Sequence, residues 1–156
     1  GPIASNVVIR NNRLIGVGQS RHYGGTGRFG AIMVRTNGTG FKLAPERSIS
    51  NISILDNEII DPPKNALYIG SARDVTISGN RVTASADSTS FGPNVGICLE
   101  NASGVKIRDF RFLDPRETVQ AGVLIRQSTA PGKEGVVIQK LDVRLPKGVK
   151  AVLDQR

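Results

Sequence analysis

The 156-residue sequence predicts an all-β protein folded as a parallel β-solenoid of about five rungs. Composition is the first reason: 15 Val and 15 Ile against 10 Leu, together with 18 Gly, favour strands and turns over helices. The second is a short apolar pattern that recurs along the chain, and the third is another kind of apolar strand between its copies. Such strands bury their apolar faces when rungs stack about 4.8 Å apart.

The first strand type reads apolar, any, apolar, any, any, Asn or apolar, any, apolar. Its copies begin at Val7, Ile52, Val75, Val105 and Val136. The third position is Ile in every copy, at Ile9, Ile54, Ile77, Ile107 and Ile138. Because side chains alternate across a strand, we expect this isoleucine to point inward and its two neighbours to point outward.

The sixth position of the pattern lies at a corner between two short strands. It is occupied by Asn12, Asn57, Asn80, Phe110 and Leu141. Asn tolerates the left-handed conformation of a tight corner, and stacked amides can hydrogen-bond along the axis. The sequence therefore predicts an Asn ladder that gives way to apolar stacking.

The second strand type supplies a third strand to each rung, over residues 31–34, 66–69, 96–99, 122–125 and 150–153. Alternation predicts two outward columns on these strands. One contains Met33, Tyr68, Cys98 and Leu124, and the other contains Arg35, Gly70, Glu100 and Arg126.

Two loops, over residues 16–30 and 35–50, are longer than the others and rich in Gly and basic residues. Loops of that length are usually functional or disordered. Shorter loops at 85–94 and 114–120 are expected at the same edge as the first long loop.

The stretches Ile52–Ile59 and Val75–Val82 resemble the repeat of the right-handed parallel β-helices of the pectate lyase-like superfamily. The resemblance covers nearly the whole chain and implies right-handed coiling, with the second strand type flooring a substrate groove. It does not select among the polysaccharide lyases, hydrolases, alginate epimerases and phage tailspikes that share the repeat. An antiparallel sandwich is the alternative, because short strands separated by turns also mark that fold.

Residues 1–2 are typical of a tag remnant, and residues 3–156 are expected to form a single β-helix domain. Repeats begin at once, without the cap that a solenoid end needs. We therefore expect the domain to be excised from a longer chain, or to form a homo-oligomer through its solenoid ends.

Several classes of protein and site are excluded by simple counts. One Cys and one His leave no disulfide framework and no structural zinc site, and no convincing carboxylate cluster offers a calcium site, so no metal or other cofactor is expected. No apolar run approaches the roughly 18–20 residues of a membrane span.

The outward columns suggest a substrate-binding site made of Arg35, Tyr68, Glu100 and Arg126. Arg can bind a sugar carboxylate through two hydrogen bonds, and Tyr can stack on a sugar ring. The alternative is that these outward residues pack beneath the long loops.

His22 and Tyr23 are the candidate catalytic residues, because the resemblance implies proton transfer next to a uronate carboxylate in lyases and epimerases. A lone loop His is more often a solvated residue, and that is the alternative. Hydrolysis requires two carboxylates flanking the bond, and Asp61 and Asp114 share a column two rungs apart, where ordinary turn acids also occur.

The formal net charge is +8. A basic face is predicted from Arg13, Arg81, Lys106, Arg108 and Arg111, opposed only by Glu58. Such a face attracts polyanions or simply keeps the surface solvated. Nucleic acid is the partner that the composition favours least, since aromatic residues are 4% of the chain and do not interleave with basic ones.

Together these features predict a domain of a secreted or extracellular protein, bacterial or phage-like, that binds an acidic polysaccharide. A non-catalytic structural or assembly solenoid, such as a tailspike or adhesin shaft, is the first alternative. A polysaccharide lyase or epimerase is the second.

Overall fold

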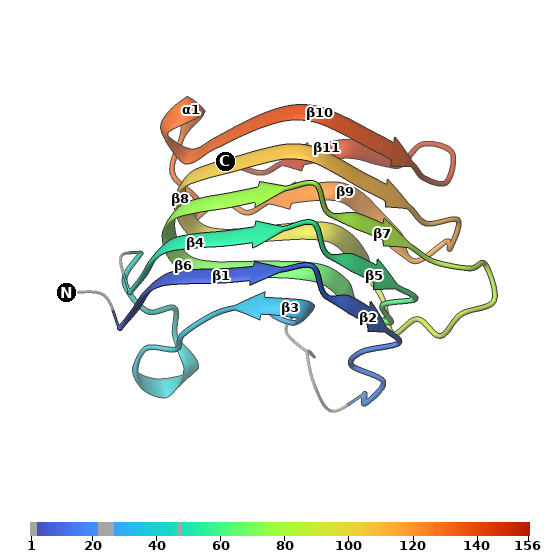
Figure 1. The fold of residues 1–156 in the computed structure, drawn as a ribbon, viewed down its shortest axis with the longest axis horizontal. Helices are drawn as coiled ribbons and strands as arrows, with labels where there is room; N and C mark the ends of the chain where they lie inside the picture. The colour runs from blue at the N-terminus through green and yellow to red at the C-terminus, as the bar shows by residue number, and fades with distance from the viewer. Residues whose placement is uncertain (1–2, 22–26, 47) are drawn as a thin grey trace.

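The computed structural model describes residues 3–21, 27–46 and 48–156 of an all-β chain (Figure 1). The strands are β1 (Ala4–Arg10), β2 (Arg13–Ile15), β3 (Gly30–Val34), β4 (Ile49–Leu55), β5 (Glu58–Ile60), β6 (Asn65–Ser78), β7 (Arg81–Thr83), β8 (Asn94–Leu113), β9 (Val119–Ile125), β10 (Val136–Arg144) and β11 (Lys150–Asp154). A 3-10 turn (Thr39–Phe41) and one helical turn, α1 (Gly132–Gly135), are the helical elements of the described residues, and neither has the length to cross a membrane.

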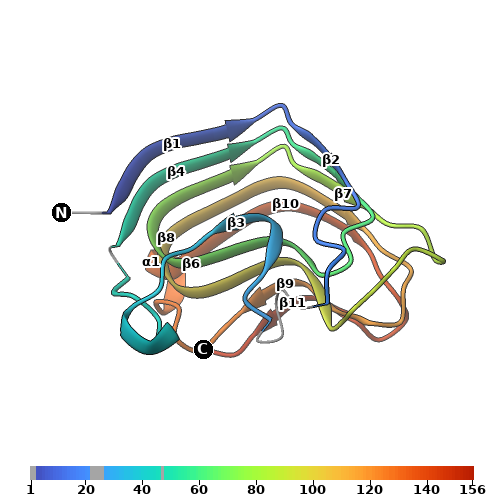
Figure 2. The ribbon, with the colours of Figure 1, turned by 90° about the horizontal axis from the view of Figure 1, so that it is seen from below.

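Every ladder between these strands is parallel, and the sheet curls around a shared interior (Figure 2). The antiparallel sandwich is therefore not the fold that forms. Within the described ranges, antiparallel pairing is confined to an isolated bridge between Asn37 and Leu43.

The strands line three sides of the curled sheet. The first side contains β1, β4, the second half of β6, the middle of β8, and β10. The second side contains β2, β5, β7 and the end of β8. The third side contains β3, the first halves of β6 and β8, then β9 and β11.

The register of the first side is the one that the repeat predicts. Ile9, Ile54, Ile77, Ile107 and Ile138 are successive Cα partners across four ladders. The three central isoleucines are at most 1% exposed, so the predicted inward column forms the middle of the core.

The Asn ladder also forms. The backbone N–H and the side-chain amide of Asn57 both donate to Oδ1 of Asn80, at 3.0 Å each, and Asn12 repeats this arrangement on Asn57. Beyond Asn80 the column continues with Phe110 beside Leu141. The expected change from amide to apolar stacking is therefore confirmed.

The left-handed residue of this corner is not the one that the sequence suggested. Positive φ angles occur one position earlier, at Asn11, Asp56, Gly79, Asp109 and Lys140. The ladder Asn instead uses its side chain to satisfy the backbone of the corner, with Nδ2 of Asn80 donating to the carbonyl of Ile54 at 2.8 Å. Backbone conformation and hydrogen bonding are thus divided between two adjacent residues.

Apolar side chains pack on both faces of the third side. The inner face contributes to the main core, where Leu67, Ile97 and Val123 are fully buried. The outer face carries a second cluster that contains Tyr68, Cys98 and Leu124. The burial of this second cluster determines which side chains of the predicted groove are exposed to a ligand.

Exposed large apolar side chains of the described residues lie in or next to β1, β2 and β3. They are Ile3, Val7, Val8, Ile15 and Met33. β1 pairs with β4 on one edge, and its other edge has no strand partner among the described residues. This end of the sheet is consequently its least covered part.

Candidate functional site

A cluster of charged side chains forms around Glu100, at the end of the third-side part of β8. The guanidinium of Arg28 donates to both carboxylate oxygens, through Nε at 2.8 Å and Nη2 at 3.0 Å. The hydroxyl of Tyr68 donates to Oε2 at 2.5 Å, and Nη1 of Arg126 lies 3.7 Å from Oε1. Arg35 joins through its Nη1, which donates to the carbonyl oxygen of Arg28 at 2.9 Å.

Burial and hydrogen bonding act in opposite directions on Glu100. Burial raises the pKa of its carboxyl, but the hydrogen bonds from Arg28 and Tyr68 and the charge of Arg126 outweigh burial and leave the pKa below its usual value. Burial, together with the bond to Glu100, raises the pKa of Tyr68. Glu100 is thus a fixed anion beside a neutral phenol at neutral pH.

The structure brings together the four residues of the predicted site and changes the part assigned to Tyr68. Its ring is 0% exposed, so it presents no open face on which a sugar could stack. Cys98 and Leu124 of the same column are also buried, as the alternative of packing beneath loops requires. Whether Arg35, Glu100 and Arg126 bind a substrate remains a prediction.

Gly70 explains how the Tyr68 ring fits. A Cβ at position 70 would lie 2.8 Å from both Cε1 and Oη of Tyr68, which is too close for any side chain. The empty place in the Arg35 column therefore lets the phenol lie against the sheet and reach Glu100.

An open pocket of about 430 Å³ borders the cluster. It is lined by Leu43, Glu100, Arg126, Gln127, Ser128 and Gln155. The wall therefore combines apolar surface with amide, hydroxyl and guanidinium groups, beside a carboxylate that is already bonded. These groups suit a hydroxylated, negatively charged ligand.

Arg28 is the member of the cluster that sequence reasoning missed. It lies at the end of the first long loop and has no place in either repeat. The same loop also reaches other parts of the third side, because the carbonyl of Gly27 accepts from Asn65 and that of Ser20 accepts from Lys64. The unusual length of the loop was the available signal.

The candidate catalytic residues His22 and Tyr23 lie outside the described residues. The two carboxylates considered for hydrolysis have structural partners. Asp61 accepts from the backbone and hydroxyl of Ser85, and Asp114 pairs with Arg116. In this structure they are therefore turn acids, which was the alternative to a hydrolytic pair.

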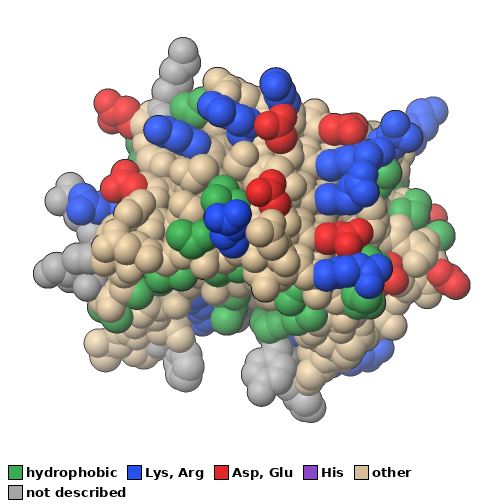
Figure 3. Space-filling model, viewed as in Figure 1, with side chains coloured by type: hydrophobic (Ala, Val, Ile, Leu, Met, Phe, Trp, Pro, Cys, Tyr) green, Lys and Arg blue, Asp and Glu red, His purple; other side chains and the backbone are tan. Residues whose placement is uncertain are grey.

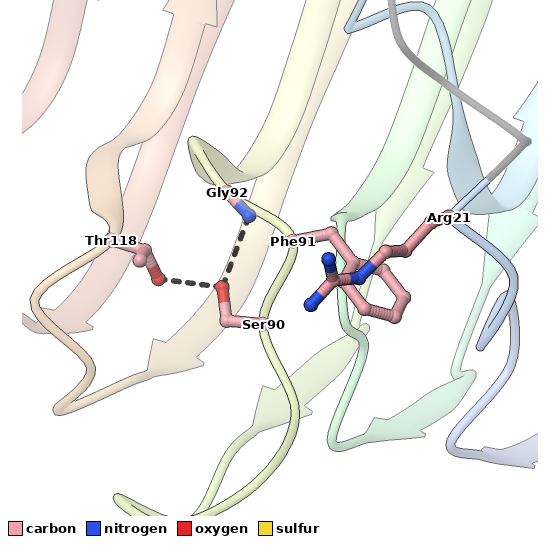
Figure 4. Close-up of a pocket in the computed structure, with 5 residues that line it drawn as sticks. All are labelled: Arg21, Ser90, Phe91, Gly92 and Thr118. Atoms are coloured by element: carbon pink, nitrogen blue, oxygen red, sulfur yellow. Dashed lines mark hydrogen bonds between the residues drawn. The ribbon is translucent and has the colours of Figure 1, made fainter.

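A second pocket, of about 520 Å³, opens at the loop edge where the third-side strands begin (Figure 4). Its lining residues are Arg21, Ser90, Phe91, Gly92 and Thr118. They come from the first long loop and from the shorter loops at 85–94 and 114–120, which confirms that these loops share an edge. None of these side chains belongs to a repeat or motif from which the pocket could have been predicted.

The loops beside this second pocket are tied together by Arg116, which is 5% exposed. Its guanidinium bonds to the carboxylate of Asp114 at 2.9 and 2.6 Å and donates to the carbonyls of Pro62 and Thr89. Three chain segments are therefore held by one side chain.

The predicted basic face is more balanced than the sequence suggested. Side chains of both signs follow one another over β2, β5 and β7 (Figure 3), with Arg13 bonded to Glu58 at 2.9 Å. Asp142 is a second acid in this column, 3.4 Å from Arg111, so the expectation that Glu58 alone opposes the face is wrong. Lys106 and Arg108 are exposed on the first side, beside Val137 and Gln139.

No group of three or more His, Cys, Asp or Glu side chains comes together in the part of the chain that the structure describes. Comparisons with protein-family models, with curated proteins and with solved structures find no match.

Proposed function

We propose that the chain forms a right-handed parallel β-helix of about five rungs, similar to the pectate lyase-like superfamily. Parallel ladders throughout and the common register of the five isoleucines support this proposal. The handedness follows from the resemblance and from the general preference of parallel crossovers for right-handed connections.

We propose further that the protein binds an acidic polysaccharide in the pocket beside Glu100. The supporting observation is that Arg28 and Arg126 both lie at the carboxylate of Glu100, with Arg35 bonded to the carbonyl of Arg28, which leaves an excess of positive charge there. A uronate carboxylate would reduce this excess, and its hydroxyls would meet Gln127, Ser128 and Gln155. Such a ligand fits a secreted or extracellular protein.

The residues would have different roles in this site. The Glu100 carboxylate, already bonded by Arg28 and Tyr68, orients the arginines. Arg126, which lines the pocket and lies 3.7 Å from Glu100, would contact the ligand. A lyase or epimerase activity would additionally require His22 and Tyr23.

The test is binding of polygalacturonate, with dextran as the neutral polymer, to wild-type protein and to Arg126→Gln by calorimetry at moderate salt. Loss of a charge-assisted hydrogen bond, of about 1.5–3 kcal/mol, predicts affinity roughly 10- to 100-fold weaker. Arg108→Gln removes the same charge from the first side and is the matched control. Equal losses in both variants, or equal binding of dextran, would refute the pocket assignment.

A structural or assembly role is the second candidate, favoured by the exposed apolar side chains around β1–β3. It predicts an oligomer whose mass, measured by light scattering, rises with protein concentration. Val8→Lys should abolish that rise, whereas a monomer at every concentration argues against this role.

A further inference from the structure

A cation–aromatic cluster lies at the pocket of about 520 Å³, called the loop-edge pocket below, apart from the Glu100 pocket. Arg21 and Phe91 line this pocket, whereas Lys64 and Phe29 are not part of its lining. The guanidinium carbon of Arg21 is 5.4 Å from the centre of the Phe91 ring. The ammonium of Lys64 is 5.6 Å from the same ring and 5.0 Å from the ring of Phe29. Two cations and two phenyl rings therefore share one small region.

The guanidinium of Arg21 faces the pocket. In Figure 4 it lies over the Phe91 ring, with nitrogens directed toward the space in front of Ser90. A guanidinium near an aromatic ring is attracted to its face, and its planar set of N–H groups matches the two oxygens of a carboxylate.

The opposite wall of the pocket supplies hydroxyl groups. The Ser90 hydroxyl donates to Oδ1 of Asn94 at 2.7 Å and accepts from the backbone N–H of Gly92. Its 2.7 Å contact with Oγ1 of Thr118 therefore uses the proton of Thr118. The lone pairs of Thr118 Oγ1 remain available to accept from a hydroxyl of a ligand.

The two cations of this region form no ion pair in the part of the chain that the structure describes, and Glu117 of the same loops lines the neighbouring pocket. Lys64 is 8% exposed, and its ammonium donates to the carbonyl of Ser20 at 2.8 Å. Neither Lys64 nor Arg21 has an ion pair with a carboxylate among the residues that the structure describes. Burial lowers the pKa of Lys64, and an anion close by would favour its charged form.

The walls are also held in place before any ligand binds. Arg116 bonds to the carbonyls of Thr89 and Pro62, and the backbone N–H of Phe91 donates to the carbonyl of Pro63 at 2.8 Å. Rigid loops reduce the entropy that binding would otherwise cost.

We propose that this loop-edge pocket is a second binding site, which takes the carboxylate of a sugar acid on Arg21 and a sugar hydroxyl on Thr118. The choice of a sugar acid rests on the proposed function, whereas the position of the site rests on the loop geometry alone. The two sites lie at opposite ends of β9, because Thr118 precedes the strand and Arg126 follows it. At about 3.3 Å per residue, the separation is roughly 25 Å.

The experiment is a titration of ¹⁵N-labelled full chain with monomeric glucuronate, with glucose as the neutral probe. We expect saturable shifts of the Gly92 and Thr118 backbone amides with glucuronate and none with glucose. Arg21→Gln should weaken binding at these amides at least tenfold. Phe91→Leu, which keeps an apolar side chain but removes the ring face, should weaken it several-fold.

The outcomes separate this proposal from the previous one. Glucuronate shifts at Gly92 and Thr118 that persist in Arg126→Gln and vanish in Arg21→Gln support the second site even if polygalacturonate fails at the Glu100 pocket. Shifts confined to Gln127 and Ser128, equal shifts with glucose, or unchanged binding in Arg21→Gln would overturn it.

Discussion

Removal of the Arg116 side chain should be strongly destabilising. The Asp114 side chain is 0% exposed and the Arg116 guanidinium bonds to both of its oxygens, so Arg116→Ala would leave a buried carboxylate with only the backbone N–H of residue 116 and no charged partner. Breaking a buried pair in this way costs about 3–5 kcal/mol. We expect a loss of that size in the free energy of unfolding, measured by urea denaturation.

Arg111→Ala is the matched control. Its pair with Asp142 is wider, at 3.4 Å, and the two side chains are 37% and 57% exposed. Exposed pairs contribute about 0–1 kcal/mol. Equal losses in the two variants would contradict the role given to Arg116.

The acid side of the stability profile should depend on Glu100. Because its folded pKa lies below the ordinary value of 4.5, the stabilising contribution is complete above that value and is lost as pH falls through the folded pKa. Glu100→Gln should therefore flatten the decline in unfolding free energy between pH 5 and pH 3. A decline as steep as that of the wild type would show that other carboxylates dominate.

At the scale of single residues, the repeat allowed part of the candidate site to be predicted. Glu100 and Arg126 could be aligned from the sequence because they follow equivalent strands, and they meet in the structure. Arg28 could not be placed, since a loop has no period from which a direction can be read. The burial of Tyr68 depends on that loop and on Gly70, so its lack of an exposed face was equally hidden.

The contribution of the Asn ladder to stability can be tested by substitution at the corner between strands. Asn80 is 1% exposed, and its Oδ1 accepts both donors of Asn57. Asn80→Ala would leave these donors unsatisfied, at about 1–3 kcal/mol each. We expect a loss of roughly 2–6 kcal/mol in the free energy of unfolding, measured by thermal or urea denaturation.

Asn12→Ala at the exposed end of the ladder removes the side-chain donor to Asn57 but leaves no buried acceptor without a partner, because Oδ1 of Asn57 still accepts from the backbone N–H of residue 12. A loss under about 1 kcal/mol is expected there. Equal losses of unfolding free energy in the two variants would contradict the expectation that the buried position of the ladder contributes more stability than the exposed one.

The positions of the strands were predicted more accurately from the sequence than the residues at which they begin and end. β6 and β8 continue through a corner as single strands of 14 and 20 residues, whereas the pattern suggested separate short ones. The reason is that Ser71 and Asn101, both with positive φ, bend the chain while the neighbouring ladder bonds are kept. Apolar periodicity reports which side chains are buried and is insensitive to such bends.

Stability should be distributed unevenly over the whole molecule. The β1 strand pairs with β4 on one edge, and most of its side chains are exposed, whereas β6 lies between β4 and β8. Local opening is easiest where few apolar contacts and backbone bonds must break. Hydrogen exchange followed by mass spectrometry should show the amides of Ala4–Arg10 exchanging well before those of residues 72–78.

Similar protection in the two segments would contradict this gradient.

At this scale the sequence predicted the parallel stacking and its register, because one inward isoleucine per repeat fixes how neighbouring strands align. The sequence could not predict how the loops lie over the third side, because loop contacts depend on individual side chains such as Arg28 and Arg116.

The equal places of Asn57 and Asn80 in the ladder have a consequence for how such a molecule can grow. Residues 49–71 span one 23-residue period, because Ile49 is the Cα partner of Ala72 and Ile54 that of Ile77. A second copy of that segment inserted after Ser71 would meet neighbours of the same shape on both sides. Tandem duplication would therefore lengthen the molecule by about 4.8 Å per copy while its cross-section stayed constant. Length in this architecture is therefore a quantity that evolution or an engineer can change in whole steps, although a copy inserted after Ser71 would move Arg28 one rung away from Glu100.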